Sequence, residues 1–287
     1  RDLAARLPRL WQREVTTGCP SPATHPQVLA DSVRQLVEHL EGSPAARELL
    51  RAQMGRQRKA FGDTLVSVTG AGSGIGRETA LAFAREGADV VISDVDAVGL
   101  GETARRLADV GVAAYSYTVD VADAAAVEAF ADEVCAEHGV PDIVVNNAGV
   151  GHAGFFLDTP AEEFDRVLDI NLGGVVNGCR SFGRALVQRG TGGHIVNVAS
   201  MASYTPVNVM NAYCTSKAAV FMFSDCLRAE LDSAGIRLTT ICPGVVGTNI
   251  VKTTRFSLPE SRTSDVEALR ARAKRGFSVR RYGPEKA

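Results

Sequence analysis

Cysteine, histidine and tryptophan are scarce in this sequence, whose 287 residues contain six Cys, five His and one Trp. The Cys and His lack the short paired spacings that bind zinc, so we expect no metal site. There is no run of 18 apolar residues and no signal peptide, which predicts a soluble, cytoplasmic protein with reduced thiols. Basic residues are not interleaved with aromatic ones, which argues against nucleic-acid binding.

A formal net charge of −2 conceals an uneven distribution. Residues 252–287 contain ten basic and four acidic residues. This basic stretch either attracts an anionic substrate, such as a fatty acid or an acyl thioester, or forms a solvated helix face. Arg outnumbers Lys by 26 to 5, a skew typical of high-GC genomes.

Tyr213 and Lys217, four residues apart in Tyr-Cys-Thr-Ser-Lys, share one face if the segment is helical. The ammonium then lowers the pKa of the phenol, which is ordinarily about 10. Such a phenol exchanges a proton with a carbinol oxygen while a hydride leaves the same carbon. The spacing alone is also that of an ordinary surface pair. With Ser200 upstream and a glycine-rich loop far ahead, it indicates a nicotinamide-dependent hydride-transfer site.

The glycine-rich loop follows Leu65–Thr69, an apolar, β-branched run that predicts a buried strand. Gly70, Gly74 and Gly76 allow a sharp turn, bring backbone N–H groups to a pyrophosphate and let the next helix, residues 74–86, pack closely. The spacing differs from the G-x-G-x-x-G fingerprint, and a plain strand-to-helix turn is the alternative.

A second predicted strand ends at Asp94, eighteen residues after Gly76. An acid at this place binds the ribose 2′-hydroxyl in a dinucleotide-binding unit. Because Asp94 repels a 2′-phosphate and Val95 rather than Arg follows it, we expect NAD to be preferred over NADP. Arg77 is the only base nearby, and a solvated helix face is its expected place.

Together these motifs resemble the short-chain dehydrogenase/reductase family over residues 64–287. The resemblance rests on Thr69-Gly70-x-x-x-Gly74-x-Gly76, Asp120-Val121, Asn146-Asn147-Ala148-Gly149, Asn171 in Asn-Leu-Gly-Gly, Ser200, Tyr213, Lys217 and Pro243-Gly244-x-x-x-Thr248. Several independent motifs in the family's order make a chance match negligible.

The resemblance implies a catalytic set. Tyr213 is the general acid/base, and Ser200 orients and polarises the substrate oxygen, with Ser203 as a weaker rival. Lys217 holds the nicotinamide ribose, and Asn171 anchors a water chain to it. The implied cofactor contacts are Gly70, Gly74, Ile75, Gly76, Asp94, Asp120, Val121, Asn147, Tyr213, Lys217, Val246 and Thr248. Asn146 serves instead to tie neighbouring strands together, and capping a turn is the structural alternative for Thr248.

Strand-like runs near residues 65, 90, 113, 142, 194 and 236 alternate with helical stretches. This order predicts an α/β fold with a Rossmann-like, doubly wound parallel sheet. The longest predicted helices span residues 162–188 and 212–234. In the family their counterparts pair across a dimer interface, so we expect a homodimer or tetramer. Because the chain stops at Ala287, the family's final helix and strand are expected to be missing.

Residues 1–42 resemble the C-terminal end of an α/β-hydrolase of the epoxide-hydrolase type, in which a His-Pro pair starts the last helix. His25-Pro26 is that pair here, and its helix is predicted to end near Glu41. Cys19 stands where that family carries its catalytic His, so we assign no hydrolase activity to these residues.

Residues 43–63 are predicted to form a helical linker to the dehydrogenase domain at residues 64–287. Fusions of these two kinds of domain occur in mycobacteria and their relatives, and the chain resembles the back half of one. We therefore expect a hydrolase domain covalently attached in the full-length protein.

The substrate pocket is expected between residues 150–157, 201–209 and 245–256, whose apolar side chains favour an apolar or lipid-like substrate. The leading interpretation is an NAD-dependent oxidoreductase of secondary alcohols and ketones. One alternative is an NAD-binding sensor or scaffold for the hydrolase, against which the intact Ser-Tyr-Lys set argues. Another is a protein whose main activity is epoxide hydrolysis, against which Cys19 weighs.

Overall fold

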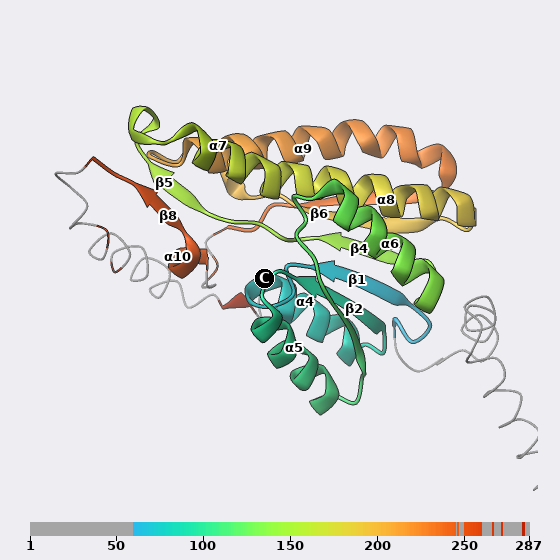
Figure 1. Ribbon diagram of the computed structural model, residues 1–287. Coiled ribbons are helices and arrows are strands. Elements are labelled where there is room, and N and C mark those ends of the chain that lie inside the picture. The colour runs from blue at the N-terminus through green and yellow to red at the C-terminus, as the bar shows by residue number, and fades with distance from the viewer. Residues whose placement is uncertain are drawn as a thin grey trace, which may run out of the picture. The chain divides into compact units, whose positions relative to one another are not determined.

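A six-stranded parallel sheet forms the centre of the computed structural model, which describes residues 60–244, 246 and 250–259 and the isolated positions 266, 271, 283 and 284 (Figure 1). The strand order is β3–β2–β1–β4–β6–β7. The strands are β1 (Leu65–Thr69), β2 (Asp89–Asp94), β3 (Ala114–Thr118), β4 (Ile143–Asn146), β6 (Gly193–Val198) and β7 (Ile236–Ile241). The chain starts at the centre and winds outward first to one edge and then to the other, which confirms the predicted doubly wound fold.

Helices cover both faces of the sheet (Figure 1). One face carries α4 (Gly74–Arg85) and α5 (Ala97–Asp109), and the other carries α6 (Ala124–His138), α8 (Gly174–Arg189) and α9 (Asn211–Leu231). Successive strand residues alternate between the two faces. Val66 and Val68 therefore pack in the core beneath α4 and α5, whereas Leu65 joins the core beneath α6 and α8.

Side-chain caps set where two of the helices begin. Asp96 accepts a hydrogen bond from Val98 N at the start of α5 (3.1 Å), and Asp123 accepts from Ala125 N at the start of α6 (2.9 Å). Such N-caps satisfy backbone donors that the first helical turn leaves unpaired. Both helices thus begin directly beyond strands β2 and β3, which places their N-termini at the carboxyl edge of the sheet.

The predicted helix 162–188 consists of two α-helices joined by a π-helical turn. Helix α7 (Ala161–Leu168) leads into the π turn Asp169–Gly173, and α8 continues from Gly174. A second, two-stranded sheet pairs β5 (His152–Gly154) with β8 (Arg255–Ser257), just after the short helix α10 (Ile250–Thr253). The sequence analysis did not predict this small sheet.

Several predictions concern residues outside the described part of the chain. They are the hydrolase-like residues 1–42, the linker up to residue 59, Thr248 and most of the basic stretch 252–287. Residues 60–63 form a turn in which the ring of Phe61 packs edge-on against Phe83, with the ring centroids 5.0 Å apart. Among the described residues, no helix has the length and apolar character needed to cross a membrane.

Candidate active site

The loop between β1 and α4 is closed by glycines. Gly70 and Gly74 have φ angles of +65° and +56°, which residues with side chains rarely adopt. A Cβ atom on Gly76 would lie 2.2 Å from the carbonyl oxygen of Gly70 and 2.4 Å from Nδ2 of Asn147. The loop therefore presents backbone rather than side chains at the N-terminus of α4, and such a cradle fits a pyrophosphate. Ile75, half-buried, lies in the first turn of that helix.

Asn147 holds this loop from the neighbouring strand. Its Nδ2 donates to the carbonyl oxygens of Thr69 (2.9 Å) and Gly70 (3.3 Å), and its backbone N–H donates to Oγ1 of Thr69 (3.0 Å). Asn146, one residue earlier, instead donates to Oδ1 of Asn197 on β6 (2.9 Å). Asn146 thus ties adjacent strands together, as expected, and Asn147 positions the glycine loop.

Asp94 ends β2 with both carboxylate oxygens engaged by backbone donors. Oδ2 accepts from Gly72 N (2.8 Å), and Oδ1 accepts from Asp96 N (3.0 Å). A Cβ atom on Gly72 would lie 2.8 Å from Asp94 Oδ2. The carboxylate is therefore fixed beside the glycine loop and half-exposed, a placement that fits the hydroxyl groups of a ribose.

The remaining expected cofactor contacts lie along the same edge of the sheet. Asp120 is exposed just beyond β3 and accepts from Ala122 N (3.0 Å). Val121 is buried, and its Cγ2 would meet a Cβ atom on Gly174 at 2.6 Å, so its side chain packs against α8. Val246 is buried beyond β7.

Asn171 is fully buried in the π turn between α7 and α8. Its Oδ1 accepts from Val150 N (2.8 Å), and its Nδ2 donates to Val150 O (3.1 Å) and to Ser216 Oγ (3.0 Å). π-helical turns are rare and occur frequently at functional sites. Here the turn aims one amide at both the loop after β4 and the helix that carries Tyr213 and Lys217.

Lys217 is buried in α9, and its Nζ donates to the carbonyl oxygen of Val198 at the end of β6 (2.8 Å). A Cβ atom on Gly149 would lie 3.4 Å from this Nζ and 3.1 Å from Oδ1 of Asn171. Both polar atoms therefore border the same point next to Gly149, which lacks a side chain. This arrangement fits the expected water-mediated link between Asn171 and Lys217.

Ser200, at the end of β6, lies close enough to Tyr213 on α9 for its hydroxyl to favour the ionised phenol and so act to lower its pKa. The Ser200 Oγ also accepts from Ala202 N (3.1 Å), which fixes the serine at the start of a short helical turn. Ser203, the rival hydroxyl, donates to the carbonyl oxygen of Lys217 (2.8 Å). Ser200, not Ser203, is therefore the hydroxyl that the structure pairs with the phenol.

The pKa values differ from the expectation based on helix spacing. Burial raises the pKa of Tyr213, and the Ser200 hydroxyl opposes this shift only in part. Burial also lowers the pKa of Lys217 to about 8. The prediction that Lys217 lowers the pKa of the phenol is thus wrong for this structure, because desolvation disfavours the charged form of both groups. The i,i+4 spacing predicted that they share a face, but it carried no information on burial.

The substrate side of the site contains features that sequence reasoning missed. His152 on β5 is buried, and its Nε2 lies 2.9 Å from Oγ of Ser257 on β8. Gly154 N donates to the carbonyl oxygen of Val209 (2.7 Å), and Val209 has a φ of +61°. A β-branched residue in this conformation is a genuine outlier. No sequence signal marks it, because nothing in the local pattern calls for a positive φ there.

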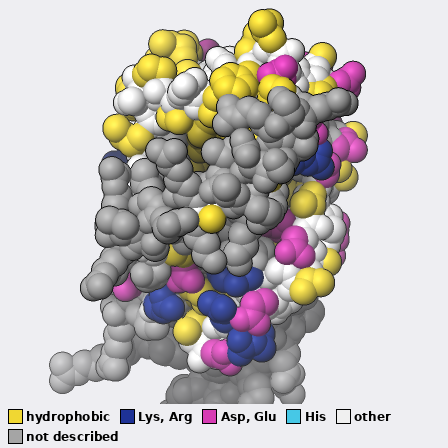
Figure 2. All heavy atoms as spheres, turned by 90° about the vertical axis from the view of Figure 1, so that its left-hand side faces the viewer, with side chains coloured by type: hydrophobic (Ala, Val, Ile, Leu, Met, Phe, Trp, Pro, Cys, Tyr) yellow, Lys and Arg dark blue, Asp and Glu magenta, His cyan; other side chains and the backbone are white. Residues whose placement is uncertain are grey.

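Large apolar side chains are exposed around this side. Leu157 is 92% exposed and Phe156 is 61% exposed, and Met201 and Val207 are about half-exposed. In Figure 2 apolar side chains gather at the top of the displayed face, at the end of the molecule that carries α7 and β5. The described residues contain no cluster of His, Cys, Asp or Glu able to hold a metal ion.

Comparisons with known proteins agree with this geometry. Residues 64–257 match the family described as short chain dehydrogenase. The chain is 63% identical over 286 residues to a protein of Mycobacterium tuberculosis named "Probable oxidoreductase EphD". That match covers 99% of the chain but only 48% of EphD, so the chain spans about half the length of this curated relative.

Solved structures share the fold. A short-chain dehydrogenase/reductase from Burkholderia phymatum in complex with NAD is 31% identical, with a TM-score of 0.71 over 77% of this chain and 82% of that one. A metagenomic short-chain oxidoreductase in complex with NADP is 33% identical, with a TM-score of 0.62 over 65% of this chain and 84% of that one. Both nicotinamide cofactors are thus represented among the structural neighbours.

Proposed function

The chain belongs to the short-chain dehydrogenase family, which comprises oxidoreductases that act on CH–OH groups with a nicotinamide cofactor, and on this premise we propose that it interconverts a secondary alcohol and a ketone. The observation that carries this proposal is the placement of the Ser200 hydroxyl next to the Tyr213 phenol, at the edge where the glycine cradle and Asp94 lie. The bound cofactor would supply the hydride acceptor.

In this proposal the chain's own residues hold the substrate oxygen and move its proton. Ser200 and Tyr213 bind the oxygen, and Tyr213 accepts its proton during oxidation and returns it during reduction. Lys217 binds the nicotinamide ribose. Asn171 is held by Val150 and Ser216 and borders the same point beside Gly149 as the Lys217 Nζ, which supports its proposed role as the anchor of a water chain.

We propose NAD as the preferred cofactor. Asp94 is fixed by two backbone donors beside the ribose position, and its charge repels a 2′-phosphate. The expected cofactor contacts are the twelve named above, of which Thr248 lies outside the described residues. A kcat/KM for NADP equal to or above that for NAD would contradict this preference.

We propose an apolar or lipid-like alcohol as the substrate. The exposed side chains of Phe156, Leu157, Met201 and Val207 support this class, because apolar residues on loops beside a catalytic set are suited to cover an apolar chain. Turnover confined to sugars or short polyols would count against it.

The second candidate is an NAD-binding sensor or scaffold without catalytic activity, joined through a linker at residues 43–63 to a hydrolase-like domain of which residues 1–42 are the end. This candidate is supported by the length of EphD, because the matched residues of this chain cover only 48% of that protein. An epoxide-hydrolysis assay on the full-length protein tests the hydrolase part, and Cys19 at the expected position of the catalytic His predicts no activity.

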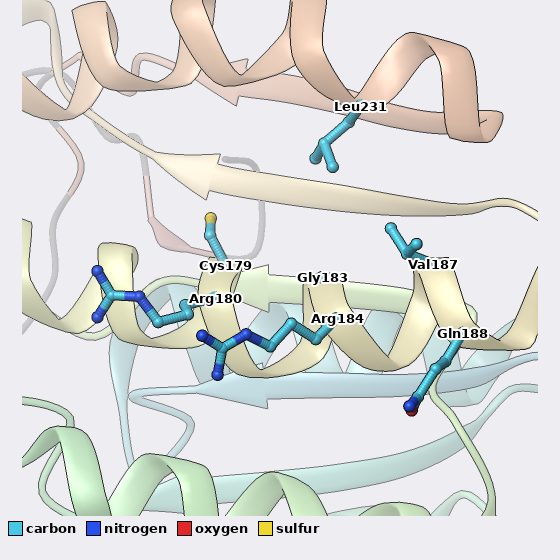
Figure 3. A pocket seen from close by; sticks show the side chains of 7 residues that line it. All are labelled: Cys179, Arg180, Gly183, Arg184, Val187, Gln188 and Leu231. Carbon is cyan, nitrogen blue, oxygen red and sulfur yellow. The ribbon is translucent and has the colours of Figure 1, made fainter.

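We further propose a homodimer through the face formed by α8 and α9. A surface groove of about 460 Å³ lies there, far from the catalytic set, between Leu231 and the α8 side chains of Cys179, Arg180, Arg184, Val187 and Gln188 (Figure 3). Val187 is 52% exposed in it. Light scattering tests the assembly: wild type should give the mass of a dimer, and Val187→Glu should shift it toward monomer. A monomeric wild type would refute this interface.

The deciding experiment is NADH formation from secondary alcohols of increasing length, with NADP tested alongside. Tyr213→Phe should lower kcat by about 10³-fold with a far smaller effect on NAD binding, because it removes the proton-transferring oxygen but only one of the twelve expected cofactor contacts. Tyr115→Phe, on the edge strand and stacked on His138, is the matched control and should keep wild-type activity. NAD binding by the wild type without turnover of any alcohol or ketone would support the sensor instead.

A further inference from the structure

Arg77, in the first turn of α4, does not lie on a solvated helix face as expected. Its side chain turns back toward the glycine loop, and its Nη2 donates to the carbonyl oxygen of Gly72 in that loop and to that of Gly99 on α5 (the latter at 3.2 Å). Its Nε donates to Oγ1 of Thr103 on α5 (2.8 Å). One guanidinium thus joins three segments: helix α4, the glycine loop and the first turns of α5.

Thr103 completes this junction from α5. It is fully buried, and its Oγ1 lies 2.8 Å from the carbonyl oxygen of Ala71 and 3.0 Å from that of Gly99, to either of which its single hydroxyl proton can be donated. A Cβ atom on Gly99 would lie 2.7 Å from the carbonyl oxygen of Gly72. The first turns of α5 are therefore in direct contact with the glycine loop, and little room is left for the loop to shift.

The junction is connected to the carboxylate of Asp94 through Gly72. Gly72 presents its carbonyl oxygen to Arg77 and its N–H to Oδ2 of Asp94 (2.8 Å). The N–H of Gly72 also shares a planar peptide unit with the carbonyl of Ala71, which lies 2.8 Å from Oγ1 of Thr103, the hydroxyl that accepts from Arg77 Nε. Arg77 and Asp94 are thus coupled through Gly72 although they do not form an ion pair with each other.

The surroundings of Arg77 also shift its pKa. Burial and the neighbouring Arg106 lower the pKa of Arg77, whereas Glu102, Glu78 and Asp96 act in the opposite direction. The guanidinium remains charged because its ordinary pKa is far above neutrality. The Nε and Nη2 donors of Arg77 are directed at oxygens within the protein. These donors therefore do not point outward toward a ligand phosphate.

We propose that Arg77 is a positioning residue for the cofactor: it holds the Ala71–Gly72 loop, and through Gly72 the Asp94 carboxylate, in the binding conformation before the cofactor arrives. This inference rests on the proposed use of a nicotinamide cofactor, but not on any particular substrate. Preorganisation of this kind strengthens binding because less conformational freedom is lost when the ligand binds.

Isothermal titration with NAD and with ADP-ribose tests the proposal on the whole chain. Arg77→Met should raise the Kd of both ligands about ten-fold or more, as expected for the loss of a charged hydrogen-bond donor. The KM for NAD should rise in parallel, with kcat at saturating NAD within about two-fold. Arg77→Lys, which keeps one donor, should recover part of the affinity, and Thr103→Val should weaken binding in the same direction with Arg77 in place.

Arg105→Met is the matched control. Arg105 is exposed on α5 and forms ion pairs with Glu102 and Asp109, away from the glycine loop, so its loss should leave both Kd values unchanged. A fall in kcat with unchanged KM for NAD would overturn the proposal, as would a loss confined to NADP, which would make Arg77 a direct phosphate ligand. Because ADP-ribose binding needs no turnover, the result stands apart from the outcome of the alcohol assay.

Discussion

The loops that follow β1 and β2 are held differently from those that follow β4, β6 and β7. On the first side, the carbonyl oxygens of Gly70 and Gly72 accept hydrogen bonds from Asn147 and Arg77, and the N–H of Gly72 donates to Asp94. On the second side, Leu157 and Phe156 stay exposed, and Val209 adopts a strained conformation.

This difference corresponds to the chemistry that each side would meet. A cofactor is the same molecule in every turnover, so a side built from fixed backbone atoms and glycine contacts suits it. A substrate varies between related enzymes, and side chains that are exposed and weakly constrained can be replaced without loss of the fold. Substitutions on the first side should therefore affect cofactor binding and stability together, whereas those of exposed side chains on the second should mainly change selectivity.

Gly76→Ala, on the first side, should have the largest effect on stability and NAD affinity. Its Cβ atom would clash with backbone at 2.2 Å, so we expect a loss of stability of about 3 kcal/mol and NAD affinity weakened more than about 100-fold. Gly101→Ala on α5 is the control, because its Cβ atom meets nothing within 4 Å; it should be neutral or stabilising by up to about 1 kcal/mol. Thermal unfolding and NAD titration measure both, and unchanged affinity in Gly76→Ala would refute the close packing described.

Lys217→Met tests the residue between the two sides. The folded-state pKa of about 8 lies below the ordinary 10.5, so the unfolded chain binds more protons between these pH values. The contribution of this lysine to stability therefore rises with pH across that window, and its burial is most costly below about pH 8.

The Met variant should be more stable than wild type at pH 7 by about 2 kcal/mol, after allowing for the lost hydrogen bond to Val198. This advantage should shrink toward pH 10, and activity should fall by at least about 100-fold. Unfolding in urea at both pH values measures the difference. A stability gap that stays constant with pH would show that Lys217 is not desolvated in the folded protein.

Removing the exposed apolar side chains of Phe156 and Leu157 should sharpen the comparison on the second side. The double variant Phe156→Ser/Leu157→Ser should lower kcat/KM for a ten-carbon secondary alcohol about ten-fold, because each buried methylene contributes about 0.8 kcal/mol. A four-carbon alcohol and the stability should be little affected. Val98→Ser, which removes an 85% exposed apolar residue in the first turn of α5, should leave the ratio of kcat/KM for the two alcohols unchanged. An equal loss for both alcohols would show that these side chains do not contact the substrate chain.

Val209→Gly should give the smallest effect. Relief of the positive φ stabilises the folded state, while the added freedom of glycine in the unfolded chain opposes it, so we expect a net gain of about 0.5–1 kcal/mol. Val207→Gly, two residues earlier and without a positive φ, should be neutral or destabilising. A lower melting temperature in Val209→Gly would mean that the side chain of Val209 contributes more by packing than its backbone loses by strain.

The two sides also differ in how far the sequence predicts them. β-branched runs, the glycine spacing and Asp94 carry local signals, so the six strands of the main sheet were predicted. The β5–β8 sheet was not, because its three-residue strands lie about a hundred residues apart and have no pattern of their own. The junction at Arg77 was not predicted for the same reason. Only the fold brings Thr103 and Gly99 next to this arginine, and without them an arginine on a helix is expected to be solvated.

The π turn at Asp169–Gly173 constrains evolution by insertion and deletion. An α-helical residue advances the helix by about 100° around its axis, and a π turn accommodates one more residue than an α turn. Deleting the extra residue there would restore a plain α-helix with α8 still facing the sheet, whereas a deletion in the α-helical turns of α7 would rotate α8 by about 100° and move Val175 and Phe182 off the sheet. In this helix, which by appearance is the most regular part of the molecule, the number of residues is therefore more tightly fixed than in many of its loops.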